Sequence, residues 1–148
     1  MIFKNPKELE RFIMKQSRQA LMKAQDEVYR IVKEWIGKFY KDYTPEFYDR
    51  TAQLFGSLVE SRIVQDGKGY KAEIYFDLSG IYNTGSKPTF EQVFNAAKMG
   101  LHGADGLHVE EGYKHISIWY DPIQELDTKA VDILVDMLRA EGIPVKKG

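Results

Sequence analysis

Residues 6 to 41 carry the longest regular pattern in the chain, and this pattern is typical of an amphipathic helix. Asn5 and Pro6 favour a helix start here, because Asn is a preferred N-cap and Pro suits the first helical position. At 1.5 Å per residue the helix would extend about 54 Å, more than the width of a compact domain of this size. We therefore expect part of it to project. Its apolar residues recur every three or four positions: Leu9, Phe12, Ile13, Leu21, Ala24, Val28, Ile31, Val32, Trp35, Ile36 and Phe39.

The segment YTPEFYDRT, residues 43–51, ends the helical pattern. Pro45 disfavours helical geometry at the preceding residue and cannot donate a backbone hydrogen bond, so the chain must turn there. We expect an elbow between helix and sheet in which aromatic rings are buried and polar tips are hydrogen-bonded. A direct contact with a partner is the alternative, because interfaces also favour aromatic residues and Arg. The elbow residues are Tyr43, Pro45, Tyr48, Arg50 and Thr51.

Two patterned segments after the elbow predict a β-hairpin. LFGSLVESRIVQ and YKAEIYFDL alternate β-branched and aromatic residues on either side of DGKG, whose Asp-Gly pair is a strong turn signal. The alternation in the second segment predicts two opposite faces. The buried face would contain Ala72, Ile74, Phe76 and Leu78, and the other face Lys71, Glu73, Tyr75 and Asp77.

The remaining sequence predicts a short helix, a strand and a final helix. Thr89 and Gln92 form a capping box at the start of the short helix. YKHISIWY, residues 113–120, alternates as a strand. The final helix would begin at Asp121 and Pro122 and end at Gly142, a favourable terminator.

This order of elements predicts an α+β fold with a long N-terminal helix. The antiparallel sheet would have about three to four strands, covered by helices on one side. At 148 residues the chain fits a single domain, 1–148, with the long helix in residues 1–42 and the α+β body in residues 43–148.

The charges are unevenly distributed along the chain. Residues 1–42 contain ten Lys and Arg against six Asp and Glu, a net of +4, and residues 43–148 contain eleven against sixteen, a net of −5. This asymmetry is compatible with head-to-tail packing of copies, or with a solvated basic helix face. The sequence also has no apolar run long enough for a membrane span and no signal-peptide pattern, so we expect a cytoplasmic site of folding.

No catalytic or cofactor pattern stands out. His102, His108 and His115 lie near several carboxylates, but their spacing matches no preformed metal-ligand pair. No Ser lies in a G-x-S-x-G elbow, and the glycines of GLHGADG lack the Lys-Ser/Thr of a phosphate loop. A pI near 6.3 and interspersed acids argue against sequence-specific nucleic-acid binding. We expect no enzyme activity, no metal and no cofactor.

The segment YKDYTPEFYDRTAQLFGSL resembles the tail-completion or head-to-tail joining family of tailed bacteriophages, which are small structural proteins. A long helix in that family leads through an elbow containing Tyr and Pro into an Arg-Thr-x-x-Leu step. AAKMGLHG, residues 96–103, is similar to a second element of prophage members, whereas residues 104–120 carry no resemblance. The matching elbow residues are Tyr43, Pro45, Tyr48, Arg50, Thr51, Leu54 and Ser57.

The resemblance implies a non-enzymatic virion or prophage protein that forms a ring at the neck or the head-proximal end of the tail. Its expected partners are copies of itself and other phage neck or tail proteins, in the bacterial cytoplasm during assembly and then in the virion. One alternative is a small metal-dependent hydrolase built around His102, His108 and Glu110. Another is a monomeric adaptor that binds a partner through the long helix.

Five apolar residues are candidates for the assembly surface. Those in the first helical turns extend past what a small sheet can cover, and those after the hairpin lie in a loop with little else to bury. We expect the two apolar residues of the loop to contact a partner protein. We expect self-association to occur through the start of the helix. The five are Leu9, Phe12, Ile13, Ile81 and Tyr82.

Overall fold

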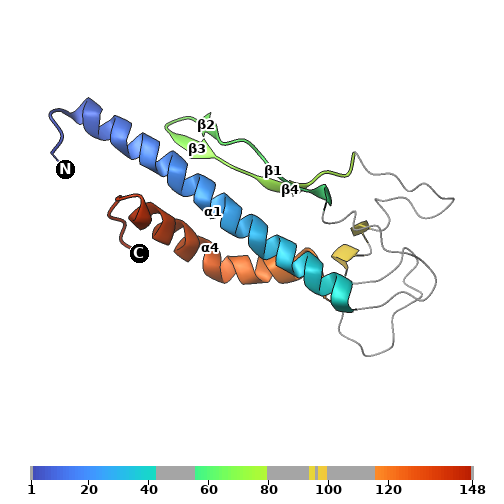
Figure 1. Ribbon diagram of the computed structural model, residues 1–148. Coiled ribbons are helices and arrows are strands. Elements are labelled where there is room, and N and C mark those ends of the chain that lie inside the picture. The colour runs from blue at the N-terminus through green and yellow to red at the C-terminus, as the bar shows by residue number, and fades with distance from the viewer. Residues whose placement is uncertain (1, 43–55, 80–93, 96, 100–115, 148) are drawn as a thin grey trace.

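The structure is a computed structural model that describes residues 2–42, 56–79, 94–95, 97–99 and 116–147. Its dominant element is helix α1, Pro6–Asp42, which spans 37 residues and thus about 55 Å (Figure 1). The Asn5 side chain caps the helix by accepting a hydrogen bond of 3.0 Å from the Glu8 backbone N–H. The Glu8 carboxylate reaches back to the Lys4 N–H at 2.6 Å. The predicted long helix and its start are confirmed.

Four short antiparallel strands form one interrupted β-hairpin. β1, Leu58–Glu60, pairs with β4, Ile74–Phe76, and β2, Val64–Asp66, pairs with β3, Gly69–Lys71. Gly67 occupies the turn between β2 and β3 with φ +59°, a conformation that favours glycine. Side chains in β4 alternate as predicted: Ile74 and Phe76 are partly buried, and Tyr75 is exposed. The alternation is wrong beyond β4, where Asp77 is partly buried and Leu78 is exposed, because the strand has ended at Phe76. The α+β class and the antiparallel pairing are confirmed, with the four strands divided between two two-stranded sheets.

The hairpin changes register at its middle. Residues 61–63 of the first half lie opposite residues 72–73 of the second, so one extra residue interrupts the ladder, as in a β-bulge. Gln25 of α1 enters this break and is 93% buried. Its Nε2 donates to the carbonyl oxygens of Ser61 and Glu73, each at 3.0 Å. At the same place the Ser61 N–H donates to the Glu73 carbonyl and the Glu73 N–H donates to the Ser61 hydroxyl, each at 2.8 Å. The helix thereby adds a second tie at the point where the register changes.

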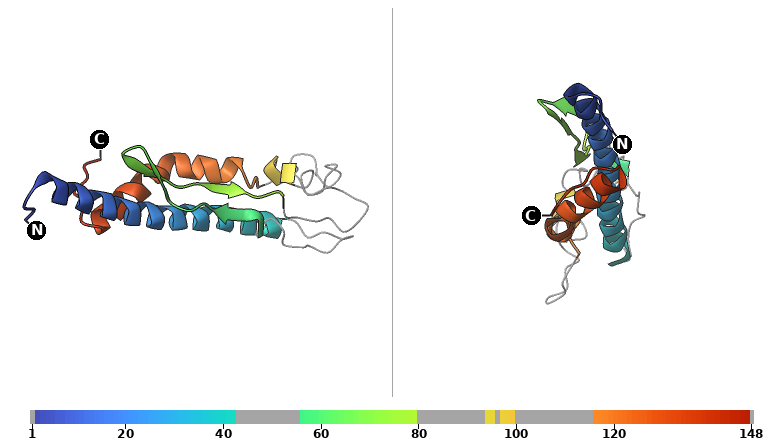
Figure 2. Two further views of the ribbon diagram at one scale, coloured as in Figure 1. Left: turned by 90° about the horizontal axis from the view of Figure 1, so that it is seen from above. Right: turned by 90° about the vertical axis from the view of Figure 1, so that its left-hand side faces the viewer.

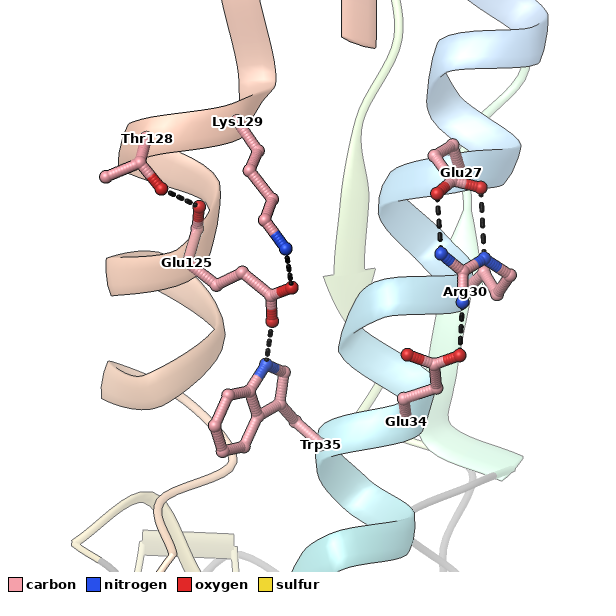
Figure 3. Close-up of polar contacts among 7 residues, drawn as sticks. All are labelled: Glu27, Arg30, Glu34, Trp35, Glu125, Thr128 and Lys129. Atoms are coloured by element: carbon pink, nitrogen blue, oxygen red, sulfur yellow. Dashed lines mark hydrogen bonds and ion pairs between the residues drawn. The ribbon is translucent and has the colours of Figure 1, made fainter. Parts of the chain in front are cut away.

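Helix α4, Tyr120–Ala140, packs against α1 (Figures 1 and 2). Between them, the Trp35 indole N–H donates to the Glu125 carboxylate at 2.5 Å, and Lys129 donates to the same carboxylate at 2.7 Å (Figure 3). These donors lower the pKa of Glu125, the Lys129 ammonium having the larger effect. Lys23 of α1 forms an ion pair with Glu141 just after α4. The two helices therefore run antiparallel.

The predicted strand at 113–120 is wrong over its described part, because residues 116–119 are irregular and α4 begins at Tyr120. Ser117 explains the difference. Its hydroxyl accepts hydrogen bonds from the N–H groups of Trp119 at 3.1 Å and Tyr120 at 2.9 Å, and its own N–H donates to Asp121 at 2.7 Å. These side-chain bonds occupy the donors that a sheet ladder would need.

The end of α4 agrees with the sequence prediction. Gly142 has φ +84°, and its N–H donates to the Arg139 carbonyl at 3.0 Å, while the Ile143 N–H donates to the Leu138 carbonyl at 3.0 Å. This pair of bonds is a Schellman motif, which satisfies carbonyls left open at the helix end.

The main core lies along the C-terminal half of α1. The rings of Phe76 and Phe94 lie 4.9 Å apart, and the Tyr29 hydroxyl donates to the Leu58 carbonyl at 3.4 Å. Phe94 and Ala97 are buried, as the predicted short helix requires, while its caps Thr89 and Gln92 lie outside the described residues. The clustered core residues are Val32, Ile36, Phe39, Leu58, Phe94, Ala97 and Ile118.

Candidate functional site

Most residues singled out in the sequence lie outside the described part of the chain. This holds for the elbow residues Tyr43, Pro45, Tyr48, Arg50 and Thr51, for the loop pair Ile81 and Tyr82, and for His102, His108 and His115. The expected bonding of Arg50 and the packing of the elbow therefore stay predictions. The described candidates are Leu9, Phe12 and Ile13, which are all in the first turns of α1.

The start of α1 extends beyond the elements that cover the rest of the helix. In both Figure 1 and the left view of Figure 2, the N-terminal turns continue past the end of α4 and past the hairpin tip. We call residues 2–19 the arm; it comprises these projecting turns and the following turns that border the end of α4 and the hairpin. It contains five Lys and Arg against two Glu, a net of +3.

One side of the arm is apolar and incompletely covered. Leu9 and Ile13 are 40% and 41% exposed, and their spacing of four places them on one helix face. At 100° per residue, Ala20 and Ala24, which are buried, lie along the same side of α1. The face of α1 that is buried farther along the helix thus continues into the arm, where it is partly exposed to solvent.

Phe12 has a different environment from its two neighbours. Its ring lies 5.2 Å from the ring of Phe3, and a hollow beside it is bounded by Ala140, Glu141 and Gly142 at the end of α4. Phe12 is only partly exposed. It therefore belongs in part to the packing of its own chain, and Leu9 and Ile13 are the cleaner probes of the arm surface.

The opposite side of the arm is basic. Lys7, Arg11, Lys15 and Arg18 follow one another at intervals of four, four and three, so they share a face about 180° from Leu9. With Glu10, Met14 and Tyr70 they line a shallow groove of about 590 Å³ between the arm and the hairpin. We call this the basic groove. Tyr70 belongs to β3, so the groove joins segments distant in the sequence.

The four cations of the basic groove make no ion pair or hydrogen bond with any residue that the structure describes. Some other cations are paired: Arg30 donates to Glu27 at 2.6 Å and also contacts Glu34 (Figure 3), and Lys147 contacts Asp132. Arg62, Lys68 and Lys146 have no ion pair with a described residue, but they do not gather along one helix face as the four groove cations do. The groove is therefore positively charged. Among the described residues that line it, only Glu10 carries a compensating negative charge.

A carboxyl pair lies where α1 meets β1. Burial raises the pKa of Glu60, and the nearby Asp26 carboxylate raises it further. Lowered pKa values occur instead where a cation or donor is close, as for Glu27 beside Arg30. The Glu60–Asp26 pair is an electrostatic cost of the fold at neutral pH.

Two features of the structure were not identified from the sequence alone. Gln25 stands within the apolar pattern of α1, and only the broken hairpin shows what it bonds. The outer face of α4 carries exposed apolar residues on both sides of Asp127, a signal that was present in the sequence, because with Asp127 they follow at intervals of three, four, four and three. These residues include Ile123, Val131 and Leu134.

The described residues contain no group of three or more His, Asp or Glu side chains placed to hold a metal ion. Within the same residues, no helix is both long and apolar enough to cross a membrane. Comparison with protein-family models, with curated proteins and with solved structures gives no match.

Proposed function

We propose that this chain is a structural assembly subunit that joins copies of itself through the arm. The observation that carries the proposal is the projecting start of α1, whose apolar side is incompletely covered and whose basic side lacks partners among the described residues. Burying the rest of Leu9 and Ile13 would stabilise a contact by on the order of 1 kcal/mol each.

The contact would be heterologous, because the arm differs in charge from the rest of the chain. An interface between two different surfaces forms a ring when its rotation closes. The resemblance of the elbow to the phage tail-completion or head-to-tail joining family suggests where such a ring belongs: the neck or the head-proximal end of a tail. In this proposal the protein assembles in the bacterial cytoplasm with other neck or tail proteins and remains in the virion, without catalysis.

Sedimentation velocity over a range of protein concentrations tests the proposal. The double variant Leu9→Gln/Ile13→Gln should weaken self-association at least about tenfold, because two apolar side chains would no longer be buried. Far-ultraviolet circular dichroism should remain unchanged, since both positions are exposed.

Val64→Gln is the matched control, because Val64 is an exposed apolar residue of β2 outside the arm. It should leave self-association unchanged. A wild-type protein that stays monomeric at all concentrations, or a double variant that assembles normally, would contradict the proposal. A monomer that binds a different neck or tail protein through the arm would support the adaptor alternative instead.

A further inference from the structure

We infer that the basic groove receives helix α4 of a second copy, through the outer face of that helix. This inference rests on the proposed self-association and identifies the surface that meets the basic side of the arm, opposite Leu9 and Ile13. The outer stripe of α4 is defined here as Tyr120, Ile123, Asp127, Val131 and Leu134.

The groove has the composition of a site for an acidic amphipathic helix. Met14 and Tyr70 supply apolar contact area, and a Met side chain adapts to irregular partners. The four cations stand along about 16 Å of α1, roughly three turns of a helix. Their alkyl stems can cover apolar atoms while their charged ends reach carboxylates. An apolar stripe that carries a carboxylate matches this surface.

The outer stripe of α4 provides such a partner. Its members follow at intervals of three, four, four and three, which places them on one helix face. The four apolar members are exposed, Val131 by 63%. Asp127 stands at the middle of the stripe and makes no contact with a described cation. Asp127 is the one charged member of the stripe, so the stripe offers the groove cations a carboxylate and no competing cation.

Pairing of two outer stripes with each other is disfavoured by Asp127. An antiparallel packing that matched Tyr120 with Leu134 and Ile123 with Val131 would place residue 127 of one copy opposite residue 127 of the other, because each pair sums to 254. Two carboxylates would then face one another in a contact that excludes water, which is costly. In the basic groove the same carboxylate meets Arg11 or Arg18 instead.

The groove and the stripe are different surfaces of one chain, so their contact is heterologous and each copy can bind two neighbours. The stripe of α4 faces away from the α1 helix of its own chain, because its apolar members are exposed while α4 packs on α1. A copy therefore cannot fill its own groove with this stripe in the observed fold.

Charge reversal tests the contact. Arg11→Glu and Asp127→Lys should each weaken self-association about tenfold or more, and the two changes in one chain should restore it to within about threefold. Arg62→Glu and Asp136→Lys are matched controls at exposed positions outside the groove and the stripe, and they should have little effect. Lack of restoration in the double variant, or an equal effect of Asp136→Lys, would overturn the inference.

Cross-linking gives a second readout, and the absence of cysteine from the chain makes it specific. A mixture of Met14→Cys and Val131→Cys proteins should form disulfide-linked dimers of one copy of each variant under mild oxidation. Met14→Cys mixed with Asp136→Cys should not, because residue 136 lies on the other side of α4.

The outcomes separate the inference from the proposed function. Self-association that depends on Leu9 and Ile13, without the 14-to-131 cross-link, would overturn the docking of α4 and leave the assembly subunit standing. Efficient cross-linking of Val131→Cys with itself would show stripe-to-stripe pairing and would also overturn the inference. A protein that does not self-associate at all would overturn both.

Discussion

Gln25 joins α1 to the hairpin at the point where the hairpin changes register. The side chain is buried and donates to two backbone carbonyls, those of Ser61 and Glu73. Replacing it with Ala would remove this donor from both carbonyls, although the Glu73 carbonyl would still accept from the Ser61 N–H. We expect Gln25→Ala to lower the free energy of unfolding by about 1 to 3 kcal/mol.

Urea denaturation followed by circular dichroism measures this loss. Gln19→Ala is the matched control, because Gln19 is a partly exposed residue of the same helix. Its side chain donates no hydrogen bond to a described residue. It should change the free energy of unfolding by less than about 0.5 kcal/mol. Equal effects of the two substitutions would show that the contact with the hairpin break contributes nothing.

Glu60 gives the fold a pH dependence of unusual sign. Its pKa is raised in the folded protein, by burial and then by Asp26, so the folded state binds this proton more tightly than the unfolded state does. Stability from this group is therefore full below the ordinary pKa and falls as the pH rises through the folded pKa. Glu60→Gln should stabilise the protein at about pH 7.5 and have little effect at about pH 4.

Thermal melts of the wild type and Glu60→Gln at both pH values check this expectation. The difference between the two proteins is the relevant quantity, because Glu27, Asp77 and Glu125 have lowered pKa values and act in the opposite direction in both. If Glu60→Gln were less stable than the wild type at the higher pH, the Glu60–Asp26 pair would not destabilise the fold, and the expectation would be wrong.

At the scale of elements, the end of α4 depends on the backbone of Gly142. Its φ of +84° lies in the left-handed region, where a Cβ costs about 1 to 2 kcal/mol. An added Cβ would lie 4.0 Å from Phe12 Cζ, an ordinary contact, so the cost arises from the backbone alone. Gly142→Ala should lower the free energy of unfolding by about that amount, measured in urea.

Gly69→Ala is a suitable comparison, because Gly69 has a φ outside the left-handed region and its added Cβ would lie 3.8 Å from the Asp66 carbonyl oxygen. It should cost clearly less than the change at Gly142. If both cost the same, the Schellman ending would not need the glycine, and the tail after α4 would be held by other contacts such as the bonds from Arg139 to the Val145 carbonyl.

At the scale of the whole molecule, the arm combines an apolar side and a basic side, and salt should affect only one of them. Raising the ionic strength from about 0.1 M to about 1 M shortens the screening length from about 10 Å to about 3 Å. Charge attraction in the basic groove would decrease, whereas the burial of Leu9 and Ile13 would persist. We expect self-association to weaken in high salt but not to disappear, as measured by sedimentation.

The protein could instead dissociate completely in high salt, at a concentration that gives full assembly in low salt. That result would show that charge attraction alone holds the contact and would contradict the expectation. The Leu9→Gln/Ile13→Gln variant provides the complementary measurement. Because its remaining attraction is electrostatic, its residual self-association should be more sensitive to salt than that of the wild type.

The sequence was sufficient for features that depend on local interactions. The start of α1 at Asn5 and Pro6, the turn at Gly67 and the end of α4 at Gly142 were all predicted, because capping and positive φ depend on residues within a few positions. The strand expected at residues 113–120 was wrong over residues 116–119. Its alternation satisfied the strand pattern, but the Ser117 hydroxyl captures the backbone donors that follow it.

The sequence by itself determined the helix bounds, the hairpin and the excess length of α1, since periodicity and chain geometry are properties of consecutive residues. Only the tertiary structure decided which parts stay uncovered. Coverage depends on where α4 and the hairpin end along α1, and that is set by packing between segments far apart in the chain. The basic groove needs Tyr70 of β3 to border the same hollow as the cations of α1, and Gln25 needs the break between Ser61 and Glu73. No spacing rule places such residues together, because their proximity arises from the burial of the core they share.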